Sequence, residues 1–143
     1  MEIEEKVQLL NNLNTKKLIQ DIQEQENKLE TLLLAEAKFR SENVGYLASY
    51  GDDCTQVKAI LADLALEPPV EADGKKATVA KVESWLRQQR STKPTLVEAI
   101  WYQNQVTFQC ENNRVAIEMA KKRMESLKGL LGLRTAQIEF LRE

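Results

Sequence analysis

A seven-residue repeat of apolar residues runs through the C-terminal third of the chain and restricts its fold more than any other feature. Counted in sevens from Leu96 and from Ala99, the repeat has fourteen positions, of which eleven are apolar. In chain order they are Leu96, Ala99, Gln103, Val106, Cys110, Asn113, Ile117, Ala120, Met124, Leu127, Leu131, Arg134, Ile138 and Leu141. Such a repeat predicts one long helix, over about 95–142, whose apolar seam is buried against other helices. The helix would measure roughly 70 Å, so it needs a helical partner along most of its length.

The N-terminal part of the chain carries a second apolar stripe. Its members recur mostly at steps of three and four, which predicts another long helix over about 3–43. The stripe consists of Ile3, Val7, Leu10, Leu18, Ile22, Leu29, Leu32 and Phe39. The spacing becomes irregular between Leu10 and Ile22, which predicts irregular packing near Asn14.

Several seam positions in the two long helices hold polar residues. These are Asn14, Gln25, Glu36, Gln103, Asn113 and Arg134. Polar residues in a helical seam favour hydrogen bonds that set the register of the helices, and a polar ligand site is the less common alternative. Glu36 and Arg134 could pair if the two long helices are antiparallel.

The middle of the chain predicts two short helices, over about 54–66 and 77–90. The segment 67–76 between them contains Pro68 and Pro69 and the turn pair Asp73-Gly74, so it predicts a surface loop. Asp53 has a glutamine three residues later, and Thr95 has a glutamate three residues later. Both spacings predict a capping box at the start of a helix.

These elements and the composition together predict an all-α fold. Aromatic residues are 6% of the chain, and only five glycines and three prolines are present, which suits helices better than strands. We expect a single domain over 1–143. Its two long terminal helices would form an antiparallel coiled-coil-like hairpin, and the two short helices would complete a four-helix bundle at one end.

The residue inventory argues against most catalytic chemistry. The chain has no histidine, which removes histidine-based triads and histidine metal sites, and no glycine-rich phosphate loop. The acidic residues outside the seam fit a solvated helix face better than a magnesium site. We therefore expect no enzyme activity, no metal and no cofactor. Cys54 and Cys110 fit no metal spacing and are expected to be reduced, in a cytoplasmic protein with no membrane segment.

The long seam predicts a protein-interaction surface. A two-helix arm buries too little apolar surface by itself, so we expect a structural or adaptor protein that forms a dimer or larger homo-oligomer, or binds a partner protein. The residues expected to form this surface are Ile117, Met124, Leu127, Leu131, Ile138 and Leu141, with Leu10, Leu18 and Ile22 opposite them.

The charge distribution keeps a second hypothesis open. The segment 1–67 has 13 acidic and 7 basic residues, whereas 68–143 has 9 acidic and 13 basic residues. The basic part could contact nucleic acid through a cluster on the last helix. The cluster consists of Lys121, Lys122, Arg123 and Lys128. An acidic partner helix in the same bundle explains the asymmetry more simply.

Overall fold

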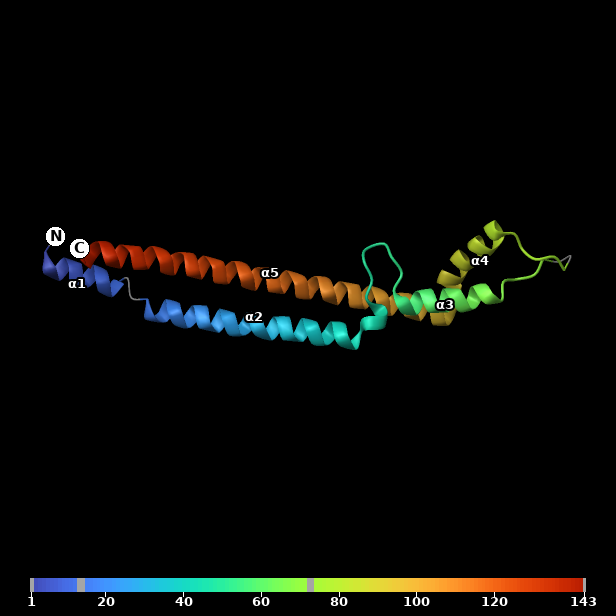
Figure 1. Ribbon diagram of the computed structural model, residues 1–143, viewed down its shortest axis with the longest axis horizontal. Helices are drawn as coiled ribbons and strands as arrows, with labels where there is room; N and C mark the ends of the chain where they lie inside the picture. The colour runs from blue at the N-terminus through green and yellow to red at the C-terminus, as the bar shows by residue number, and fades with distance from the viewer. Residues whose placement is uncertain (1, 13–14, 72–73, 143) are drawn as a thin grey trace. The chain divides into compact units, whose positions relative to one another are not determined.

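The computed structural model describes residues 2–12, 15–71 and 74–142, which form helices and no β-strand (Figure 1). In chain order the elements are α1 (Ile3–Asn12), α2 (Lys16–Glu42), a 3-10 helix η1 (Val44–Tyr46), α3 (Thr55–Leu66), α4 (Val79–Thr92) and α5 (Pro94–Arg142). The all-α prediction is confirmed. The predicted helix over 3–43 is represented by α1 and α2, and the irregularity expected near Asn14 lies outside the described residues. None of the helices in the described ranges combines the length and apolar composition needed to cross a bilayer.

The two predicted capping boxes are wrong. Cys54 is the N-cap of α3 without a side-chain cap hydrogen bond, because the Asp53 carboxylate binds Arg90 instead. Helix α5 begins at Pro94, and the Lys93 carbonyl accepts from the Leu96 and Val97 amides at 3.1 and 2.9 Å. Proline suits the first helical position because the missing N–H has no partner there in any helix.

The loop between α3 and α4 closes on itself. Val70 and Lys76 form an isolated antiparallel bridge, and the Glu71 amide donates to the Lys75 carbonyl at 3.0 Å. Gly74 has φ of 82°, a conformation that glycine adopts at no steric cost. This agrees with the predicted turn at Gly74, whereas Asp73 is outside the described residues. Helix α4 begins two residues later than predicted, where the Thr78 hydroxyl accepts from the Lys81 amide.

The chain divides into two compact units, and α5 contributes to both. One unit consists of Lys38–Asn112 and has its core between α3 and the start of α5. The buried residues of this core are Cys54, Val57, Leu96 and Ala99. Val57 and Leu96 are fully buried, which stabilises the fold by roughly 1.5–3 kcal/mol each. The expectation of one domain over the whole chain stays a prediction.

The other unit consists of Met1–Ala37 and Asn113–Glu143, in which α2 lies beside α5 (Figure 1). The Glu26 carboxylate lies 3.6 Å from the Lys128 ammonium, and the Glu36 carboxylate accepts a hydrogen bond from the side-chain amide of Asn113. Later residues of α2 therefore lie beside earlier residues of α5. Glu36 meets Asn113 and not Arg134, because this order places Arg134 beside the start of α2.

The burial pattern confirms the predicted apolar stripes over most of their length. All fourteen repeat positions of α5 are buried or half-buried. In α2, Leu18 and Ile22 are buried, and the stripe continues through half-buried residues as far as Phe39. In α1 the pattern fails, because Ile3 and Val7 are 80% and 50% exposed.

Candidate functional site

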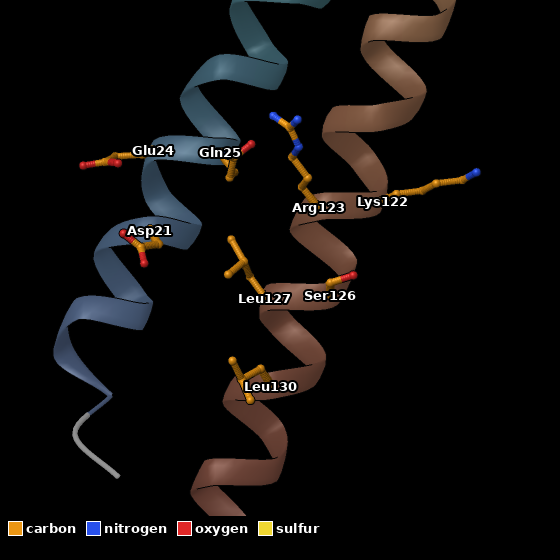
Figure 2. Close-up of a pocket in the computed structure, with 8 residues that line it drawn as sticks. All are labelled: Asp21, Glu24, Gln25, Lys122, Arg123, Ser126, Leu127 and Leu130. Atoms are coloured by element: carbon orange, nitrogen blue, oxygen red, sulfur yellow. The ribbon is translucent and has the colours of Figure 1, made fainter. Parts of the chain in front are cut away.

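The candidate site is an open groove between α2 and α5, within the unit that contains the chain ends. Its volume is about 550 Å³. Three residues from α2 and five from α5 line it, namely Asp21, Glu24, Gln25, Lys122, Arg123, Ser126, Leu127 and Leu130. Figure 2 shows these side chains on the two neighbouring helices.

The seam between the two helices forms the floor of the groove. Leu127 is a repeat position of α5, and Gln25 is a position of the α2 stripe, so both are half-buried. Leu127 and Gln25 point into the space between the helices, whereas Glu24 and Lys122 extend away on opposite sides (Figure 2). Helical periodicity explains why the floor of the groove is apolar and its walls are charged. Residues one or two positions from a seam residue lie on the flank of the helix, where they remain exposed to solvent.

The two walls carry opposite charges. The α2 wall presents the carboxylates of Asp21 and Glu24, and the α5 wall presents the bases Lys122 and Arg123. Within the described parts of the chain, none of these four groups forms an ion pair or a hydrogen bond with another residue. The groove therefore has one acidic wall and one basic wall along its length. It can pair with a surface that places basic groups beside the acidic wall and acidic groups beside the basic wall.

Gln25 places a buried polar atom in the groove, without a hydrogen-bond partner in the described part of the chain. Its Oε1 atom is buried and has no hydrogen-bond donor among the residues that the structure describes. A buried amide oxygen left without a donor costs about 1–3 kcal/mol. A guanidinium or ammonium group entering the groove would relieve this cost.

A second apolar stripe borders the groove on α5, and sequence reasoning missed it. Met119, Leu130, Leu133 and Phe140 are 50%, 39%, 58% and 74% exposed. Together with half-buried Ala116 and with three polar residues, they recur at alternating steps of three and four. In chain order the positions are Ala116, Met119, Arg123, Ser126, Leu130, Leu133, Gln137 and Phe140. A count for a second repeat, one position before each member of the first seam from Ile117 onward, would have found this stripe in the sequence.

The residues expected to form an interaction surface lie mainly inside the chain. Leu18, Ile22 and Ile117 are 3%, 7% and 8% exposed, so α2 and α5 bury them against the rest of this unit. The remaining six are half-buried, namely Leu10, Met124, Leu127, Leu131, Ile138 and Leu141. Of the nine, only Leu127 lines the groove. Their role in binding stays a prediction.

The four basic residues expected at a nucleic-acid surface are all exposed, but acids accompany them. Lys121 lies 4.0 Å from Glu118, and Lys128 lies 3.6 Å from Glu26. Lys122 and Arg123 line a groove whose other wall is acidic. Neutralisation of this kind reduces the number of counterions that binding to a phosphate backbone could release.

The other unit contains a polar cluster that joins α3, α4 and α5. The Arg90 guanidinium donates two hydrogen bonds, of 2.8 and 2.7 Å, to the Asp53 carboxylate. These bonds hold the pKa of Asp53 below its ordinary value and raise the pKa of Arg90. Gln103 Oε1 accepts from the buried Cys54 amide at 2.6 Å, in place of a side-chain cap. The cluster borders a smaller hollow of about 310 Å³, and its members are satisfied by one another, so we assign it a structural role.

Comparison of the chain with protein-family models, curated proteins and solved structures found no match. Among the described residues, no group of three or more His, Cys, Asp or Glu side chains is placed to hold a metal ion. The groove between α2 and α5 has a half-buried apolar floor and opposite charges on its two walls. An exposed apolar stripe of α5 runs through the basic wall.

Proposed function

We propose that this protein is a non-catalytic structural or adaptor protein that self-associates through α2 and the C-terminal part of α5. The observation that carries the proposal is the second stripe of α5. The first seam is buried or half-buried within the chain, whereas Met119, Leu133 and Phe140, in the same stripe as the groove-lining Leu130, are at least half exposed. Regularly spaced apolar residues on a helix are the feature by which another helix is recognised.

The arrangement we infer for the chain is an antiparallel coiled-coil hairpin of α2 and α5. The order of the Glu26–Lys128 and Glu36–Asn113 contacts supports it. In the other unit, we infer that α3 and α4 complete a four-helix bundle with the adjoining parts of α2 and α5. The core of α3 and α5 residues and the Asp53–Arg90 pair support this bundle.

A hairpin of this kind gives a partner helix a groove to occupy. Two helices packed side by side leave a furrow along each flank, and a third helix placed in it contacts both. Here one furrow has a volume of about 550 Å³ and is bordered by apolar residues on α5. Burial of these residues supplies the driving force for association, and the charges on the walls supply specificity.

The test is the sedimentation of the full chain across a range of concentrations. The wild-type protein is expected to sediment as a dimer or larger. Leu133→Asp, which places a charge in the exposed stripe, should shift the equilibrium toward monomer while the helix content measured by circular dichroism is kept. Leu34→Asp is the matched control, because Leu34 is 64% exposed on α2 and does not line the groove.

Two results would contradict the proposal. A wild-type chain that is folded and monomeric at every concentration would exclude self-association. Equal effects of Leu133→Asp and Leu34→Asp would show that the stripe has no special part in it. Retention on heparin that falls steeply with salt, and that is lost on neutralising Lys121, Lys122 and Arg123, would favour the nucleic-acid hypothesis instead.

A further inference from the structure

We infer that the occupant of the groove is α5 of a second copy of this chain, lying antiparallel to the first α5. The twofold axis would pass between the levels of Arg123 and Ser126. This inference rests on the proposed function and specifies the partner, its direction and its register.

The first six positions of the second stripe, from Ala116 to Leu133, read the same in both directions, as a twofold antiparallel contact requires. These positions are Ala116, Met119, Arg123, Ser126, Leu130 and Leu133. They are apolar, apolar, polar, polar, apolar and apolar. In a symmetric dimer the same patch faces itself in reverse, so a pattern of this kind puts apolar residues opposite apolar ones across these six positions. Gln137 and Phe140 lie beyond them.

Both kinds of apolar layer in this register pair apolar side chains, and the second pairs a small residue with a large one. Met119 lies opposite Leu130 of the second copy, and small Ala116 lies opposite Leu133. Each layer occurs twice because of the symmetry. A large residue beside a small one fills the space between helices more evenly than two large residues would.

At the centre, Arg123 lies opposite Ser126 of the second copy. The short serine side chain leaves the guanidinium room to continue across the groove toward α2. In a parallel arrangement in the same register, Arg123 would instead face Arg123 of the second copy, and like charges at the centre of an interface oppose association.

In this register the Arg123 guanidinium of the second copy lies beside the acidic wall formed by Asp21 and Glu24. Glu36 is level with Asn113, so equal steps along the two helices from this contact place Ser126 level with Gln23. Arg123 of the second copy, opposite Ser126, therefore reaches α2 between Asp21 and Glu24. Both carboxylates are without an ion pair in the described chain.

The buried oxygen of Gln25 lies two residues from the same level. Figure 2 shows it pointing from α2 toward α5, on the side where Arg123 projects. A guanidinium has five N–H donors, enough for a carboxylate and for the Gln25 oxygen that has no donor among the described residues. The Arg123 guanidinium of the second copy would thus pair with the acidic wall and also donate a hydrogen bond to the Gln25 oxygen.

The test uses two full-length variants with opposite charges in the groove. One carries Lys122→Glu and Arg123→Glu, which makes both walls acidic. The other carries Asp21→Lys and Glu24→Lys, which makes both walls basic. Each alone is expected to raise the dimer dissociation constant at least tenfold, about 1.4 kcal/mol, by analytical ultracentrifugation. An equal mixture should form one-to-one dimers as tight as those of the wild type, because every acidic wall then faces a basic one.

A control pair carries the same types of charge reversal outside the groove. Glu30→Lys lies on the outer side of α2, and Lys121→Glu lies on the flank of α5 away from the groove. Both residues are exposed, and the single 4.0 Å pair of Lys121 with Glu118 is worth little. These variants should dimerise as the wild type does.

A fully reversed chain, carrying all four groove substitutions, should dimerise again. Dimers that persist unchanged in the acidic and basic variants would overturn this inference and leave self-association standing. A wild-type chain without any dimer would overturn self-association itself. Loss of dimer in the control variants as well would show that charge acts without regard to position, which also contradicts the groove-to-groove contact.

Discussion

Gln103 holds the start of α3 against α5, and replacing it with methionine should destabilise the unit that contains both. Methionine has a similar length and stays apolar in the seam, but it has no strong acceptor for the Cys54 amide. Cys54 is 1% exposed, so water has no ready access to the vacant donor. The 2.6 Å hydrogen bond from Cys54 N is therefore lost without replacement.

The expected loss is about 2 kcal/mol. A buried donor left without an acceptor costs about 1–3 kcal/mol, and better apolar contact of the methionine side chain recovers a part of it. The contact from Gln103 Nε2 to the Asp52 carbonyl measures 3.5 Å and adds little. With a urea dependence of about 2 kcal/mol per molar, the unfolding midpoint should fall by about 1 M.

Tryptophan fluorescence during urea unfolding measures the effect where it arises, because Trp85 and Trp101 both belong to this unit. Gln105→Met is the matched control. It makes the same chemical change two residues along α5, at an exposed position without a hydrogen bond among the described residues. Equal midpoints for Gln103→Met and Gln105→Met would refute the assignment of a structural role to the Gln103 amide.

Two further predictions concern the same unit. Arg90→Met should lower its stability by about 1 kcal/mol near neutral pH, since the pair with Asp53 has two charge-assisted bonds but is 35% and 25% exposed. Because the pKa of Asp53 is lowered in the fold, the contribution is present above its ordinary value of 3.8 and is lost as the pH falls through the lowered value. The urea midpoints of the wild type and Arg90→Met should therefore converge as the pH falls through the lowered pKa of Asp53, and a gap that widened there would contradict the linkage. Leu96→Ala removes a fully buried side chain and should cost about 2–5 kcal/mol, whereas Val97→Ala, at a position 42% exposed, should change the urea midpoint little. Similar midpoints for the two variants would count against the described core.

The periodic part of the fold could be predicted because burial along a helix depends on spacing alone. All fourteen positions of the seven-residue repeat from Leu96 to Leu141 are buried or half-buried in α5, including polar Gln103, Asn113 and Arg134. The same logic identified the buried face of α2. The ends of α3 and α5 were also close, because Pro68 and Pro94 fix where helical hydrogen bonding can stop or begin.

The contacts between elements could not be predicted, because spacing along one helix says nothing of its neighbour. Asp53 had the position of a helix cap, but Arg90 lies 37 residues away and offers a stronger, bidentate partner. The sequence did not show which residue of α5 the Glu36 carboxylate would contact, because the register of the two helices could not be predicted. The groove depends on the same information, since its acidic wall and its basic wall come from opposite ends of the chain.

The polar residues of the seam set the register of α2 and α5, and the charged walls of the groove depend on this register. A slip of seven residues between α2 and α5 would keep apolar residues facing one another and would move the helices by about 10 Å. Such a slip would separate Glu36 from Asn113, and it would also carry Lys122 and Arg123 away from the level of Asp21 and Glu24. The apolar seam therefore provides most of the stabilisation without choosing the register, and polar contacts such as Glu36–Asn113 choose it. Asn113→Leu should accordingly keep the helix content measured by circular dichroism while weakening dimerisation in ultracentrifugation. Unchanged dimerisation in this variant would show that the register is set elsewhere.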